Sequence, residues 1–82
     1  MSLKMRNAQM GDQSMELNNL MGVVDFKKKY VELLNSKELT KGELDPANIR
    51  MFAMGKELKD DLFIYSYDII NESTVQVMIR KT

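Results

Sequence analysis

Cysteine and histidine are both absent from this sequence, and proline occurs only once, at Pro46. Without cysteine or histidine the chain has no thiol nucleophile, disulfide, thiolate zinc site, imidazole base or Ser-His-Asp triad. Carboxylates remain available as acids and bases, but such catalysis needs a pocket, which a two-layer domain of this size rarely encloses. The sequence therefore predicts a protein that is not an enzyme and that carries no cofactor or metal.

A net charge is also lacking, because 12 basic residues balance 12 acidic ones. A balanced chain has no long-range field to draw it to nucleic acid or to an anionic membrane. No apolar run approaches the roughly 18 residues that span a bilayer, and the amino terminus lacks the apolar stretch of a secretory signal. We therefore expect no contact with nucleic acid or membrane, and an intracellular location in the cytoplasm, the nucleus or both.

What the chain does have is enough material for one hydrophobic core, since 44% of its 82 residues are hydrophobic. This length is too short for two independently folding domains. We therefore expect residues 1–82 to form a single domain, and we expect it to be monomeric.

The first part of the chain alternates between apolar and polar residues, as a strand with one buried face does. Residues 3–6 alternate apolar with basic side chains, and residues 14–18 place Met15 and Leu17 on one face. Turn-forming residues at 10–13 lie between these two stretches. The pattern predicts two antiparallel strands joined by a hairpin turn.

The apolar period then changes to that of a helix. Between Val23 and Leu34 the apolar residues fall at helical intervals, while charged residues occupy other directions. This pattern predicts an amphipathic helix that frays near Asn35 and Ser36. Because Pro46 cannot donate a hydrogen bond inside a helix, a loop or a short helical turn is expected in the segment 36–45 that leads to it.

Two further strands are expected after Pro46. Residues 49–53 form a short apolar run that is followed by a turn at Gly55 and Lys56. Residues 71–74 introduce a last strand at 75–80, in which every second residue is β-branched and faces inward. Its outward-facing residues are Gln76, Met78 and Arg80. This order predicts an α+β domain in which one main helix packs across a mixed sheet of four to five strands.

Residues 49–80 resemble the second half of ubiquitin and its relatives. The motifs that carry the resemblance are Arg50-Met51-Phe52, Gly55-Lys56-Glu57-Leu58-Lys59-Asp60, Tyr67-Asp68-Ile69, Glu72-Ser73-Thr74 and the closing strand. The spacing Val23-x-x-Phe26-Lys27-x-x-Tyr30 is similar to that of the family's helix, and the first two strands align without a gap. The resemblance covers most of the chain and implies a ubiquitin-like β-grasp fold.

The sequence departs from the family pattern in two places. The segment 36–45 is several residues longer than its family counterpart, and a surface loop absorbs such an insertion at little cost. Conjugated members end in two glycines, which let the tail pass through the narrow channel of a conjugating enzyme, whereas this sequence ends in Arg80-Lys81-Thr82. The resemblance therefore implies a domain of the non-conjugating type, which we expect to be excised from a longer protein.

The resemblance also implies a binding surface. In ubiquitin a small apolar patch on the outer sheet face binds helical and zinc-bearing partners, and its positions match Ala8, Phe52, Gln76 and Met78 here. A rigid aromatic ring beside a flexible thioether suits a helix that lies in a shallow groove. Basic side chains expected around the patch, where they would steer acidic partners, are Arg50, Lys56 and Arg80.

Plainer interpretations of these residues have to be weighed as well. Phe52 would then be an ordinary half-buried strand residue and Met78 a single exposed apolar side chain. The run from Lys27 to Lys29 predicts a solvated helix face, with Lys27 near the sheet edge. Tyr67 resembles the family's structural tyrosine, whose hydroxyl holds the preceding loop through backbone hydrogen bonds.

The residues and the resemblance together predict a non-catalytic interaction domain that links its host protein to the ubiquitin–proteasome system. Its expected partners are proteins, such as ubiquitin receptors, proteasome subunits or ubiquitin-handling enzymes. Two alternatives stay open. One is a conjugable modifier truncated before its glycine tail, and the other is a β-grasp assembly or GTPase-binding domain that uses the strand edge at Arg6.

Overall fold

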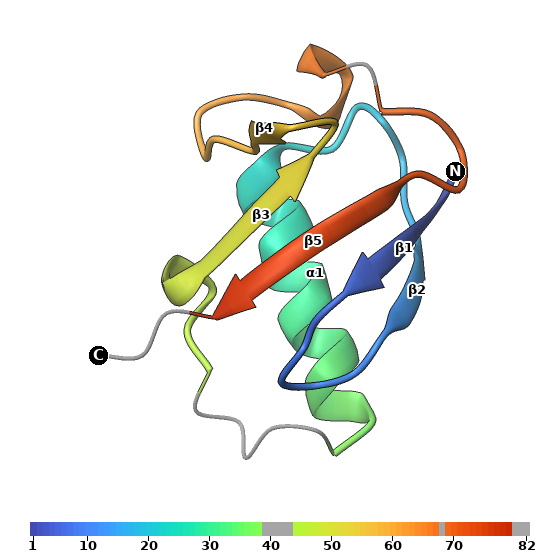
Figure 1. Ribbon diagram of the computed structural model, residues 1–82. Coiled ribbons are helices and arrows are strands. Elements are labelled where there is room, and N and C mark those ends of the chain that lie inside the picture. Colours follow the sequence, from blue (N-terminus) through green and yellow to red (C-terminus); the bar gives the residue numbers. More distant parts are fainter. Residues whose placement is uncertain (39–43, 68, 80–82) are drawn as a thin grey trace.

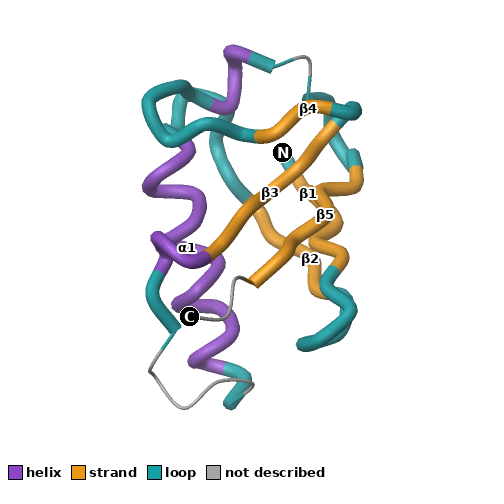
Figure 2. Tube along the Cα trace, turned by 60° about the vertical axis from the view of Figure 1, so that its left-hand side comes forward, coloured by secondary structure: helices purple, strands orange, loops and turns teal. Residues whose placement is uncertain are grey.

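The structure, a computed structural model, describes residues 1–38, 44–67 and 69–79. Its elements and their bounds are β1 (Ser2–Arg6), β2 (Gln13–Glu16), α1 (Val23–Ser36), β3 (Ile49–Ala53), β4 (Lys56–Glu57) and β5 (Thr74–Ile79), with short 3-10 turns at Pro46–Asn48 and Ile64–Ser66. Figure 1 shows α1 running behind the strands, and Figure 2 shows the same two layers from another side.

All five strands belong to one sheet with the order β2-β1-β5-β3-β4. The central strands β1 and β5 are parallel, and the other three neighbouring pairs are antiparallel. Helix α1 covers one face of the sheet, and no described element covers the other (Figures 1 and 2). The predicted α+β β-grasp architecture is confirmed, with five strands in the mixed sheet.

The core lies between the sheet and α1, and it is filled by the alternating apolar residues that the sequence pattern identified. Leu3 and Met5 of β1 are fully buried, and Met15 of β2 and Val75 and Val77 of β5 are buried beside them. From α1 the largest buried side chains are Phe26 and Tyr30. Several of the eight methionines fill the spaces between these branched and aromatic groups, as flexible thioethers commonly do.

Helix α1 ends at Ser36, which confirms the predicted fraying point. It begins at Val23 without a side-chain cap, and Asp25 in its first turn interacts favourably with the positive end of the helix dipole. It is neither long nor apolar enough to cross a bilayer, and the same holds for every helix in the described part of the chain. A short helical turn starts at Pro46, while residues 39–43, at the centre of the predicted insertion, lie outside the described residues.

The predicted turn at Gly55 is confirmed and has a specific geometry. Met54 and Gly55 form the two-residue connection between β3 and β4, with φ angles of 55° and 77°. Positive φ at both positions is the pattern of a type I′ hairpin turn, which matches the twist of the flanking strands. Glycine adopts this conformation freely, whereas methionine carries a steric cost there.

A buried polar contact ties the β1–β2 turn to the helix. The Asn7 side-chain amide donates to the Tyr30 hydroxyl at 3.0 Å, and its oxygen accepts from the backbone N–H groups of Gln9 and Met10. Burial raises the pKa of Tyr30, and the hydrogen bond from Asn7 opposes this effect in part. Asn7 therefore stabilises both the conformation of the turn and the position of α1 on the sheet.

Two side chains hold the long segment between β4 and β5. The Tyr67 hydroxyl accepts from the Lys59 backbone N–H at 2.7 Å, which confirms the predicted structural role of this tyrosine. The expectation of a solvated face is wrong for Lys27, which is 7% exposed and whose ammonium lies 2.6 Å from Asp60. It is correct for Lys28 and for its neighbour in sequence, Lys29, both of which are exposed.

Candidate functional site

Three of the predicted patch residues share the outer face of the central strands. Phe52 on β3 pairs with Gln76 on β5, and Met78 lies two residues further along β5, opposite Arg50. Met78 is 50% exposed, and Phe52 is half-buried. Strand alternation explains this placement, because the intervening residues of both strands face the core.

Ala8 reaches the same surface from the β1–β2 turn. It lines a surface groove of about 530 Å³ together with Gln76 and Met78, and Arg6 and Asp12 contribute to the same groove. The structure therefore brings together the four residues that the resemblance singled out. We refer to Ala8, Phe52, Gln76 and Met78 as the sheet-face patch.

Arg50 belongs to this surface but is already engaged by two neighbours. Its guanidinium lies 5.2 Å from the centroid of the Phe52 ring, and it forms two hydrogen bonds to the Glu57 carboxylate, at 3.0 and 3.1 Å. The hydrogen bond from Arg50 lowers the pKa of Glu57, and the same contact raises the pKa of Arg50. Arg50 thus orients the Phe52 ring, while most of its charge is balanced within the domain.

The other two predicted basic residues are placed differently. Lys56 is exposed, but the register pairs it with the inward-facing Ala53, so it starts from the sheet face opposite the patch and the prediction that it lies beside the patch is wrong. Arg80 lies outside the described residues. Of the predicted basic rim, the described structure therefore places only the paired Arg50 on the face of the patch.

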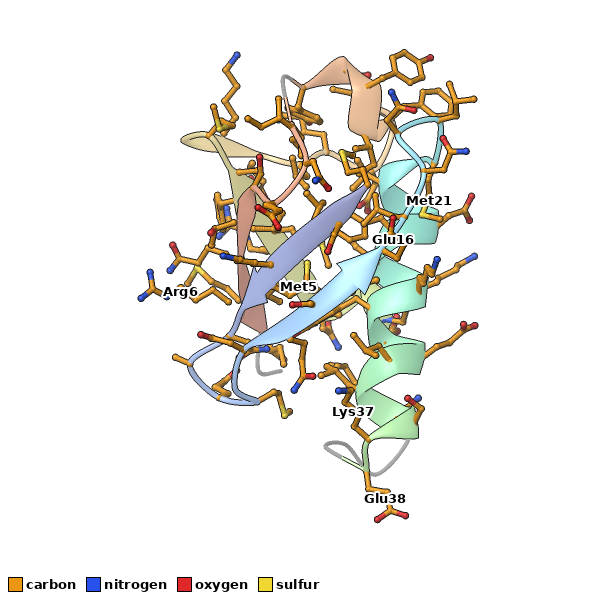
Figure 3. The ribbon with its side chains drawn as sticks, turned by 90° about the vertical axis from the view of Figure 1, so that its right-hand side faces the viewer. Met5, Arg6, Glu16, Met21, Lys37 and Glu38 are labelled. Carbon is orange, nitrogen blue, oxygen red and sulfur yellow. The ribbon has the colours of Figure 1, made fainter. Side chains whose placement is uncertain are left out.

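A basic residue that the sequence analysis did not assign to the patch lies beside it. The parallel register sets Arg6 of β1 beside Gln76, and Lys4 beside Thr74. Figure 3 shows Arg6 on the side of the sheet that faces away from α1. Among the described residues neither Lys4 nor Arg6 has an ion-pair partner. The alternation of residues 3–6 placed both on the outer face, but only the strand order shows that this face continues into the patch.

Open hollows border this surface. The groove beside the patch is open to solvent, and a second open hollow of about 540 Å³, lined in part by Lys4 and Arg6, adjoins it. Within residues 1–38, 44–67 and 69–79, no three acidic side chains gather closely enough to hold a metal ion. Apolar side chains, a flexible amide and unpaired cations on a flat sheet provide contacts for another protein.

Comparison with known proteins identifies the fold. The chain is similar to a solved structure described as the N-terminal ubiquitin-like domain in the 4931431F19Rik protein, with a TM-score of 0.81 and 21% sequence identity. The superposition covers 100% of this chain and 76% of that chain. In all, 301 chains of solved structures match, so the architecture is a widespread one. No family model matches the sequence, and a search of curated proteins found no significant match.

The chain therefore has the ubiquitin-like β-grasp fold, as the motifs between residues 49 and 80 indicated. A fold shared by so many proteins does not by itself establish a function. The function has to be argued from the surface that the fold presents.

Proposed function

We propose that this ubiquitin-like domain is a non-catalytic recognition module that binds a helical segment of a ubiquitin–proteasome protein across its outer sheet face. In a longer host protein it would bring that host to a ubiquitin receptor, a proteasome subunit or a ubiquitin-handling enzyme inside the cell. The observation that carries the proposal is that half-buried Phe52 and half-exposed Met78 share an outer sheet face that no described element covers, and that an open groove adjoins them.

The apolar part of the site supplies an anchor and an adaptable neighbour. Arg50 fixes the Phe52 ring from one side, so little side-chain entropy is lost when a partner packs against the ring. Met78 is exposed and unbranched, and it adjusts to the shape of an incoming aliphatic side chain. The groove between Met78 and Ala8 receives the next turn of such a helix.

Charge selects the kind of helix. Lys4 and Arg6 on the outer face have no ion-pair partner among the described residues, while Glu57 is neutralised by Arg50. An acidic helix with an apolar stripe would place its stripe on the patch and its carboxylates near these cations. Such charges at a rim accelerate association and reject basic competitors more than they add affinity.

The test is an NMR titration of the labelled domain with a proteasomal ubiquitin-receptor helix. We expect shifts centred on Phe52, Gln76 and Met78. Phe52→Ala should weaken binding at least roughly tenfold, as loss of a central aromatic anchor does. Arg6→Ala should reduce the association rate and its dependence on salt.

Two further variants keep this experiment decisive. Met78→Glu changes a half-exposed residue, so it should leave the fold intact and still weaken the binding of an acidic helix. Tyr65→Ser, on a different surface, is the matched control and should bind normally. Absence of shifts up to millimolar helix on a folded domain would refute the proposal, and it would favour the plainer view of Phe52 as a strand residue only.

A further inference from the structure

A second group of exposed apolar side chains lies at the end of the domain where α1 begins. The segment before α1 meets the segment that contains the Ile64–Ser66 turn, and both lie at the top of Figure 1. Leu20 is 68% exposed, Tyr65 56% and Phe63 43%. With the less exposed Val24 and Leu62 they form a surface that we call the aromatic platform.

The backbone beneath the aromatic platform is firmly held. The two segments run antiparallel, with a bridge between Gly22 and Phe63. The bridge consists of two backbone hydrogen bonds, from Val23 N to Leu62 O and from Ile64 N to Met21 O, and one further bond runs from Tyr65 N to Asn19 O, all at 2.9 to 3.0 Å. Met21, labelled in Figure 3, marks this junction beside the start of α1. Side chains carried by such a ladder are ordered before any partner arrives.

The two rings of the platform are also fixed relative to each other. Phe63 and Tyr65 stack with their centroids 5.2 Å apart and an angle of 9° between their planes. A Cβ placed on Gly22 would lie 3.8 Å from two carbons of the Phe63 ring, so the ring packs directly over the glycine. Two stacked rings that stay largely in water contribute little to the core, but they offer a flat, preformed contact area.

The charged residues within the two segments of the platform have one sign. In the segments 18–25 and 60–67 every charged residue is an aspartate, and these are Asp25, Asp60 and Asp61. Asp60 is balanced by Lys27, whereas Asp25 and Asp61 have no ion-pair partner among the described residues. This sign is opposite to that of Lys4 and Arg6 beside the sheet-face patch. The aromatic platform therefore complements a positive partner and repels the acidic helix expected on the other face.

We infer that the aromatic platform is a second protein-binding surface, which takes a basic and apolar segment of another protein. A guanidinium or ammonium group of that segment lies over the stacked rings of Phe63 and Tyr65, where the ring quadrupoles attract a cation. Asp25 and Asp61 balance the remaining positive charge, and an aliphatic side chain contacts Leu20 and its neighbours. This surface is independent of the sheet-face patch, so the domain can hold two partners of opposite charge at once.

The experiment uses two synthetic amphipathic peptides that differ only in charge. One is built from leucine, alanine, arginine and lysine, and its twin carries glutamate in place of every basic residue. Titrated into the labelled domain, the basic peptide should shift the resonances of residues 20–25 and 61–66. Tyr65→Ser should weaken this binding roughly threefold to tenfold, as expected for loss of one cation–π contact with its ring. The double variant Asp25→Asn, Asp61→Asn should weaken it further and reduce its salt dependence.

The control variant is Phe52→Ala, which should leave binding of the basic peptide unchanged. Failure of the receptor helix at the sheet face would therefore not affect this result. Three outcomes would overturn the inference: no shifts in residues 20–25 and 61–66 at millimolar peptide, equal binding of the acidic twin, or undiminished binding by the double aspartate variant. Shifts of the same residues on dilution of the protein alone would also overturn it, because a second copy of the chain would then occupy the platform.

Discussion

The ion pair between Lys27 and Asp60 joins two sites of unequal exposure, and its two partners should differ in the cost of their removal. The Lys27 side chain is 9% exposed and the Asp60 side chain 58%. Removing one partner lowers the free energy of unfolding by about 3–5 kcal/mol in a fully buried pair and by about 0–1 kcal/mol in an exposed one. Because this pair has one buried and one exposed partner, Asp60→Ala should lower it by about 2 kcal/mol. Lys27→Met keeps most of the aliphatic stem and leaves a carboxylate that water can solvate. Its cost should stay below about 1 kcal/mol.

Urea unfolding followed by circular dichroism measures both free energies, and for a domain of this size about 2 kcal/mol lowers Tm by roughly 8–16 °C. The double variant should be about as stable as Lys27→Met alone, because without the buried ammonium Asp60 has no charge to balance. Asp61→Ala, at the exposed neighbour, is the matched control and should change stability by less than about 0.5 kcal/mol. A Lys27→Met variant as unstable as Asp60→Ala, or additive losses in the double variant, would refute this account of the pair.

Three further outcomes follow from single contacts. Met54→Asn should stabilise the domain by about 0.5–1 kcal/mol, because asparagine tolerates the left-handed φ of 55° that methionine adopts before Gly55; an unchanged or lower urea midpoint would contradict this. Tyr67→Phe should cost about 1–2 kcal/mol, because the Lys59 N–H loses its acceptor, and native-state hydrogen exchange at Lys59 should become faster. Burial raises the pKa of Tyr30 above its ordinary value of 10.0, so the folded chain keeps a proton that the unfolded chain releases. The stability that this proton contributes is complete below about pH 10 and is lost as pH rises through the folded pKa. Tyr30→Phe should therefore make the unfolding free energy less dependent on pH in the alkaline range. An unchanged dependence would exclude Tyr30 as its cause.

The elements that the sequence predicted best are those encoded by short-range periodicity. Alternation placed β1, β2 and β5, and the helical period placed α1 and its end near Ser36. The parallel pairing of β1 with β5 leaves no such trace, because it joins residues at the two ends of the sequence. The sequence predicted a mixed sheet without naming this pair, and the resemblance of residues 49–80 implied only the fold that contains it.

The same distinction applies to the surfaces. Gln76 and Met78 were placed outward by alternation, and Phe52 was placed there by the resemblance, whereas the position of Arg6 beside the patch depends on the strand order. The burial of Lys27 depends on Asp60, which follows it by 33 residues. The aromatic platform escaped notice because its two rings lie in an irregular segment, where neither a helical nor a strand period marks which side chains are exposed.

The central pair of strands also has a consequence for synthesis of the protein. Thr74 pairs with Lys4 but leaves the ribosome about 70 residues later, and at roughly 5–20 residues per second this delay is about 4–14 s. During that time β1 lacks its parallel neighbour, and the apolar face that Met5 shares with Leu3 has no complete sheet to join. A nascent chain stopped before β5 is therefore not a smaller folded domain. It is two hairpins and a helix with open strand edges on β1 and β3, which a ribosome-associated chaperone is suited to cover.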